Sequence, residues 1–101
     1  MAHYLVRAKA KDNLDELRQR LDADDIRQYR PAGNEMTQCL NNARITPDRW
    51  VTWEENCFCN PPLKQERRDV LDFYFTDLST ETVSKGRGWA QIEHLPSVWE
   101  K

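Results

Sequence analysis

The sequence predicts a small α+β domain, a two-layer sandwich in which helices pack on one face of a small, mostly antiparallel sheet. Its 101 residues, 39% of them hydrophobic, suit a single domain that spans residues 1–101. Segments with the two-residue period of strands are interspersed with segments at helical spacing, in the order β-α-α-β-α-β-β. This mixture favours helices laid against one small sheet.

The first half of the chain predicts one strand followed by helices. Residues 3–10 alternate, with four apolar side chains on one face, as in a strand that is covered mainly on one side. Asn13 is followed three residues later by Glu16, which is typical of a capped helix start. A short helical turn is expected over 22–29, and apolar residues at helical spacing predict a further helix over 34–43.

The second half predicts a strand, the longest helix and two more strands. Residues 49–57 carry large side chains on both faces, and residues 62–75 follow a proline pair that suits a helix start. Residues 78–83 and 89–94 are predicted as strands. The linker 84–88 between them contains two glycines, which favours a hairpin.

Charge and hydropathy exclude several function classes. The chain has 15 basic and 17 acidic residues, so it has no general excess of positive charge for nucleic-acid binding. No apolar run approaches the roughly 20 residues that a membrane-spanning helix needs. The first residues lack the features of a signal peptide, and three cysteines are an odd number, so we expect a cytoplasmic protein with reduced thiols.

The closely spaced cysteines Cys57 and Cys59 leave three interpretations open. Together with Cys39, His3 and His94 they could supply zinc ligands, although zinc sites space paired cysteines more widely. Cys59 also lies just before a predicted helix start, where partial positive charge favours a reactive thiolate. The third interpretation, which we favour, is that the cysteines pack as small buried hydrophobes, so we expect no metal site and no cofactor.

Arg67 falls inside the apolar arc of the helix predicted over 62–75. A guanidinium at this position needs an acidic partner or an anionic ligand, and Glu54 or Glu55 on the preceding strand could pair with it. The alternative is a ligand pocket in which Arg67 and Trp53 contact the ligand. The candidate catalytic residues are then Cys59, His94 and Glu54, although no nucleophile or phosphate-loop motif is present.

The apolar arc of the same helix is wider than one small sheet can cover. Its side chains spread over about 200°, whereas an arc slightly above 100° is enough to pack on a sheet. We therefore expect a homodimer or another protein partner, with an interface built from Leu71, Phe73, Phe75 and Trp99. The sequence thus favours a binding or interaction module. The alternatives are a small cofactor-independent enzyme or anion-binding protein, and a cysteine-based metal or redox site.

Overall fold

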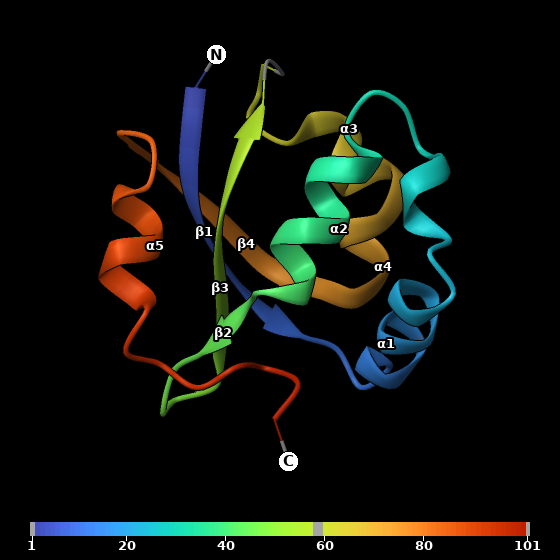
Figure 1. The fold of residues 1–101 in the computed structure, drawn as a ribbon, viewed down its shortest axis with the longest axis horizontal. Helices are drawn as coiled ribbons and strands as arrows, with labels where there is room; N and C mark the ends of the chain where they lie inside the picture. The colour runs from blue at the N-terminus through green and yellow to red at the C-terminus, as the bar shows by residue number, and fades with distance from the viewer. Residues whose placement is uncertain (1, 58–59, 101) are drawn as a thin grey trace.

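The sheet of the computed structural model has four antiparallel strands in the order β2-β3-β1-β4, which confirms the predicted α+β class (Figure 1). The structure describes residues 2–57 and 60–100. The strands are β1 (Ala2–Ala10), β2 (Arg44–Ile45), β3 (Trp50–Cys57) and β4 (Phe75–Val83). In the centre of the sheet, Val6 of β1 lies opposite Trp53 of β3 and Thr80 of β4.

Four helices, α1 to α4, lie on one side of this sheet, and α5 lies on the other side (Figure 1). The helical segments are α1 (Leu14–Asp22), the 3-10 turn η1 (Ile26–Gln28), α2 (Gly33–Asn41), α3 (Lys64–Glu66), the π-helical turn η2 (Arg67–Leu71), α4 (Asp72–Tyr74) and α5 (Arg87–Ile92). The helix after Asn13 is confirmed, but the Asn13 side chain does not cap it. Its Nδ2 instead donates a 2.9 Å hydrogen bond to the carbonyl oxygen of Phe73.

The main core lies between the sheet and helices α1 to α4. Val6 and Trp53 project from the sheet and meet Leu17 of α1 and Leu40 of α2, and all four side chains are fully buried. The Trp53 ring centroid lies 5.2 Å from that of Phe75, in a tilted arrangement that aromatic pairs favour. The period-two pattern of the central strands therefore places their apolar faces as the sequence predicts.

The helical segment 64–74 is enclosed by its own chain, contrary to the expectation of excess apolar surface. Leu71 and Phe75 are only 0% and 3% exposed, because η1, α1 and α2 share one core with this segment. Trp99 is half-buried, and its indole N–H donates a 2.7 Å hydrogen bond to the Leu40 carbonyl. Only Phe73 of the four expected interface residues is well exposed, at 59%. The argument for a partner on this helix therefore fails at Leu71 and Phe75.

The predicted strand over 89–94, and with it the hairpin, is wrong. Residues Arg87–Ile92 form α5, which begins after Gly86 at a φ of 83°. Trp89 and Ile92 are spaced three residues apart, so they lie on one face of this short helix, and Ile92 is buried. The strand predicted over 78–83 is confirmed and begins earlier, at Phe75.

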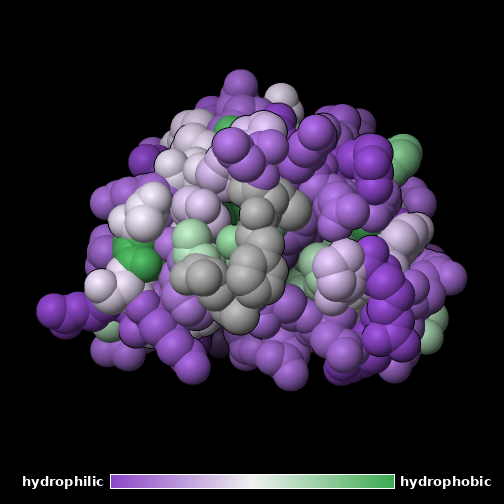
Figure 2. All heavy atoms as spheres, turned by 90° about the horizontal axis from the view of Figure 1, so that it is seen from above, coloured by the Kyte–Doolittle hydropathy of each residue, from purple (hydrophilic) through white to green (hydrophobic). Residues whose placement is uncertain are grey.

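The surface is largely polar where Figure 2 shows it. Outside the atoms drawn in grey, hydrophilic residues predominate on this face, and apolar atoms appear in small separate areas. In the described part of the chain, no helix has the length and apolar character needed to cross a bilayer.

Candidate functional site

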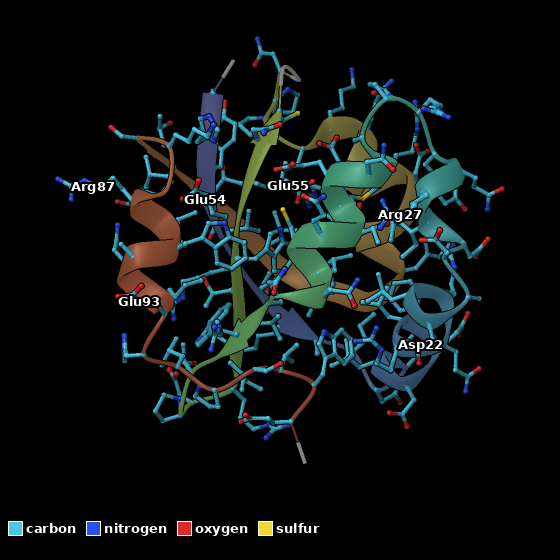
Figure 3. The ribbon with its side chains drawn as sticks, in the orientation of Figure 1. Asp22, Arg27, Glu54, Glu55, Arg87 and Glu93 are labelled. Atoms are coloured by element: carbon cyan, nitrogen blue, oxygen red, sulfur yellow. The ribbon has the colours of Figure 1, made fainter. Side chains whose placement is uncertain are left out.

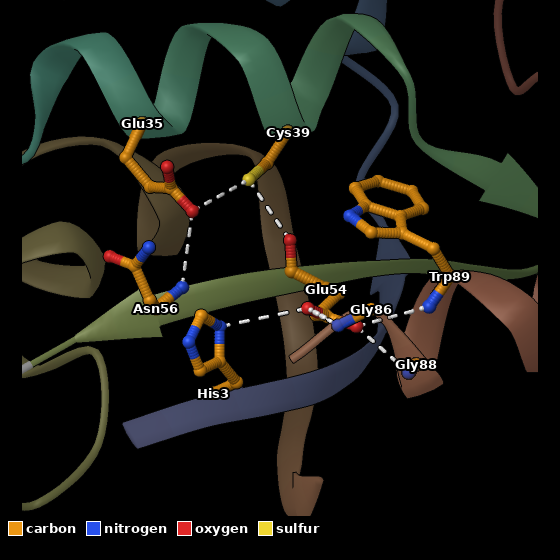
Figure 4. A network of polar contacts seen from close by, with 8 residues as sticks. All are labelled: His3, Glu35, Cys39, Glu54, Asn56, Gly86, Gly88 and Trp89. Atoms are coloured by element: carbon orange, nitrogen blue, oxygen red, sulfur yellow. Dashed lines mark hydrogen bonds and ion pairs between the residues drawn. The ribbon is translucent and has the colours of Figure 1, made fainter. Parts of the chain in front are cut away.

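The outer edge of β3 is covered in two different ways along its length. β2 pairs with Val51 and Thr52 only, and no other strand among residues 2–57 and 60–100 lies beside the rest of this edge. There, the Asn56 N–H donates a 3.2 Å hydrogen bond to Oε2 of Glu35, and the Cys39 thiol lies 3.0 Å from the Glu54 carbonyl oxygen (Figure 4). Both side chains come from α2, which is thereby fastened to the strand edge.

The Glu54 carboxylate binds the first turn of α5. Its Oε2 accepts a 2.9 Å hydrogen bond from the Gly86 N–H, and its Oε1 accepts bonds from the N–H groups of Gly88 (2.8 Å) and Trp89 (3.1 Å). The first N–H groups of a helix have no partner within the helix and carry partial positive charge, so a carboxylate stabilises them. Glu54, which is 5% exposed, therefore holds α5 against the sheet (Figure 4).

His3 is the second titratable side chain at this position. Its Nδ1 lies 3.6 Å from Oε2 of Glu54, and the His3 side chain is 17% exposed. The antiparallel register creates this proximity, because His3 is opposite Asn56 and Leu5 is opposite Glu54. Diagonal neighbours on one face of an antiparallel pair are within reach of long side chains.

These groups border a groove of about 610 Å³ between α2 and α5. The side chains of His3 and Trp89 line it, together with charged groups of both signs, including Arg44 and Lys85. Three amide side chains also contribute to the lining: Gln38, Asn42 and Asn56. The groove therefore offers hydrogen-bond donors, acceptors and one large aromatic surface.

Cys39 is a lining residue that stays protonated. Burial raises the pKa of its thiol far above the ordinary value, and the carboxylates of Glu55, Glu35 and Glu54 raise it further. A thiol is a poor nucleophile compared with a thiolate. Among the residues that the structure describes, no serine or threonine lines the groove.

Glu55 lies on the opposite side of β3 from Glu54 (Figure 3). Its Oε1 accepts a 2.8 Å hydrogen bond from the Trp53 indole, whereas its buried Oε2 has no hydrogen-bond partner among the described residues. Burial raises the pKa of Glu55 to about 8, against the effect of the Trp53 bond and with a further contribution from Glu66 and Glu35. This carboxyl group belongs to the core and not to the groove.

The predicted pairing of Arg67 with Glu54 or Glu55 is wrong. Arg67 Nε lies 3.3 Å from Asp72 Oδ1, and both side chains are about half-exposed. Glu54 faces α5 and Glu55 is held by Trp53, so neither carboxylate is directed to Arg67. Arg67 lines neither the groove nor two smaller hollows of about 500 and 250 Å³.

Those of the remaining predicted site residues that the structure describes do not meet at the groove. Trp53 is fully buried in the core, and His94 is exposed after α5 and does not line the groove. Cys57 is buried, and Cys59 lies outside the described residues. Within residues 2–57 and 60–100, no group of three or more His, Cys, Asp or Glu side chains is arranged to hold a metal ion.

Sequence reasoning identified Glu54 but missed its histidine. His3 was considered only as a zinc ligand, because it is 51 residues away from Glu54 in the chain, as the two residue numbers show. The strand register brings the two together, and no local motif records that register. Comparison of the chain with protein-family models, with curated proteins and with solved structures finds no match, so the site is interpreted from its geometry alone.

Proposed function

We propose that this chain is a binding protein that holds a small polar ligand in the groove between α2 and α5, with His3 as the main polar contact. The observation that supports this function is the His3–Glu54 pair beside the groove. Glu54 is fixed by three backbone N–H groups, so it gives the His3 imidazole a rigid neighbour. The volume of about 610 Å³ falls in the range of small-molecule sites.

The lining indicates the chemistry of the ligand. Amide side chains donate and accept hydrogen bonds, and the partly buried Trp89 ring can pack against a planar or apolar part of a ligand. Arg44 and Lys85 share the groove with the carboxylates of Glu35, Glu54 and Glu93, so the lining presents charges of both signs to a ligand. We therefore propose a neutral or zwitterionic molecule that both donates and accepts hydrogen bonds.

A proton-transfer enzyme is the second candidate for the same groove. A histidine placed beside a carboxylate is the usual arrangement of a general base, because the carboxylate orients the ring. The protonated thiol makes Cys39 a poor nucleophile, so the role of acid or base falls to His3 in this candidate.

We also propose a cytoplasmic location. Cys39 is a free thiol, and a free thiol is compatible with a reducing compartment.

The two histidines of the chain allow a direct test, since His3 borders the groove and His94 does not. The imidazole signals of both residues are followed by NMR while a library of small amides, alcohols and heterocycles is added. We expect binders to shift the His3 signal and to leave the His94 signal unchanged. Affinity should fall about tenfold in His3→Ala, equivalent to roughly 1.4 kcal/mol, and should be unchanged in His94→Ala. A library in which no compound shifts His3 selectively would contradict the proposal.

A further inference from the structure

β4 is an edge strand of nine residues with one neighbour, β1. The opposite edge of the sheet is covered by β2 and by the α2 side chains of Glu35 and Cys39. The outer edge of β4 has no comparable cover. Among the described residues, no hydrogen bond reaches it from another element.

The sheet geometry identifies the backbone groups on this open edge. In an antiparallel sheet, the N–H and C=O of one residue point to one neighbour, and those of the next residue point to the other. The Glu54 carbonyl and the Asn56 N–H bind side chains of α2, so the backbone groups of these two residues point away from β1. The residues between and beside them on β3 therefore bond to β1, where their partners are the even-numbered residues. The backbone groups of the odd-numbered residues of β1 accordingly point to β4. Ser79 and Glu81 of β4 lie opposite odd residues of β1. The outward groups are therefore those of residues 78, 80 and 82.

Residues 78–83 form a regular strand with few of the usual protections against edge pairing. The stretch LSTETV contains no proline or lysine, and its β-branched residues favour strands. Its one charged side chain is Glu81. The irregularity in the pairing of β4 with β1 lies before residue 78, near Asp77, which has a φ of 55°. A run of six regular residues is therefore available to another strand.

We propose that a second copy of this chain pairs with β4 in antiparallel orientation and joins the two sheets into one. Residues whose backbone groups point outward must pair with outward-pointing residues of the second copy. These residues alternate along β4, so the two-fold axis that relates the copies passes through a residue and not between two residues. Within 78–83, two such registers pair five residues: one is centred on Thr80 and the other on Glu81. The second register sets Glu81 against its own copy, which is unfavourable.

Charge therefore selects the register centred on Thr80. In this register Thr80 faces Thr80 of the second copy, and Glu81 faces the uncharged Ser79. Opposed threonines are a favourable cross-strand pair. The outward groups of Leu78 and Thr82 then bond to each other across the axis. The sequence of β4 can thus pair with its own copy without a like-charge contact, and this self-complementarity is the reason to assign the open edge to a second copy. The inference does not depend on the function of the groove.

The experiment combines sedimentation equilibrium with amide hydrogen exchange over a range of concentrations. We expect the mass to rise from 12.0 kDa towards twice that value. The amides of Thr80 and Thr82 should exchange about tenfold more slowly once nine-tenths of the protein is dimeric, because exchange then occurs only from the remaining monomer. The amides of Ser79 and Glu81, which face β1, should be protected at every concentration.

Two substitutions at one position separate the β4 edge from the rest of the surface. Thr80→Pro removes an N–H that faces solvent in the monomer, so it should keep the 12.0 kDa species at all concentrations. Thr80→Val keeps the N–H and the strand preference, and should dimerise like the unsubstituted chain.

Three results would overturn the proposal. The first is a mass of 12.0 kDa at every concentration. The second is a dimer that persists in Thr80→Pro. The third is a dimer in which the Thr80 and Thr82 amides exchange as fast as in the monomer, which would place the interface elsewhere, for example at Phe73. The exchange measurement needs no substitution, so it decides the question even if Thr80→Pro fails to fold.

Discussion

The Oε1 atom of Glu54 accepts a 2.8 Å hydrogen bond from the backbone N–H of Gly88. This bond joins the part of β3 that lies beyond β2 to the first turn of α5, across 34 residues of chain. The close approach needs a glycine, because a Cβ at position 88 would lie 2.9 Å from Oε1 and 3.2 Å from the Cβ of Glu54. The position of α5, and with it one wall of the groove, therefore depends on this pair.

Replacing Glu54 by Gln should loosen α5. The substitution removes the charge and one of the two acceptor atoms that bind Gly86, Gly88 and Trp89, and it places an NH₂ group against backbone donors. We expect a loss of about 1.5–3 kcal/mol in the free energy of unfolding, measured by urea denaturation. Glu93→Gln, at an exposed position just after α5, is the control and should stay within about 0.5 kcal/mol. An equally small effect of Glu54→Gln would contradict the capping role.

Replacing Gly88 by Ala should destabilise the protein, although this change usually stabilises a helix by about 1 kcal/mol. Overpacking against the Glu54 side chain opposes the helical preference, and we expect a net loss of about 1–3 kcal/mol. Thermal or urea unfolding measures the effect. The control is a double-mutant cycle, since the same change in a Glu54→Ala background has room for the new methyl group and should cost less. Additive effects would show that Gly88 and Glu54 are not coupled.

How much of the fold can be predicted from the sequence depends on the length of each local pattern. β1, α2 and β3 have patterns of eight to nine residues, and all three were predicted correctly. α5 has six residues, and a run this short is compatible with a strand or a helix. Its helical state is stabilised by Glu54, a residue of a distant strand, and no local pattern contains that contact.

The candidate site was predictable only in its separate residues. Glu54 was identified as a possible acid or base, but Arg67 and His94 were expected beside it. The structure instead places His3 there, because β1 is the neighbour of β3 in the sheet. Strand order was not predictable from the sequence, so this pairing could not be found. The wide apolar arc expected over 62–75 counted Phe75, which belongs to β4. The expectation also underestimated how far α1 and α2 enclose the buried side chains of segment 64–74.

Cys39 should be inert towards thiol reagents in the folded protein. The thiol is 4% exposed, and burial with neighbouring carboxylates raises its pKa far above the ordinary value, so thiolate is scarce at neutral or mildly alkaline pH. We expect no alkylation of Cys39 by iodoacetamide at pH 8 in the folded state, and rapid alkylation in urea. Peptide mapping by mass spectrometry assigns the modified cysteine. Modification of Cys39 without unfolding would contradict the buried, protonated state.

Glu55 should make stability fall as the pH rises. Burial raises its folded pKa from the ordinary value of 4.5 to about 8, so between these pH values the folded state holds a proton that the unfolded state releases. The contribution of the protonated Glu55 carboxyl group to the free energy of unfolding is fully present below pH 4.5 and is lost as the pH rises through 8. Between these pH values the free energy of unfolding falls by about 1.4 kcal/mol per pH unit, and the total loss is on the order of 5 kcal/mol.

Glu55→Gln removes this titration, because the amide is neutral at every pH while its oxygen can still accept the Trp53 indole bond. Urea unfolding of both proteins from pH 5 to pH 9 measures the difference in stability between them. We expect the stability of the variant relative to that of the unsubstituted chain to increase from pH 5 to pH 9, by a few kcal/mol at pH 9. Glu81→Gln, an exposed substitution on β4, should leave the pH profile unchanged. Parallel profiles for Glu55→Gln and the unsubstituted chain would mean that Glu55 is ionised in the folded protein at neutral pH. Its buried Oε2 would then have to be solvated by water that enters the core between β3 and α2.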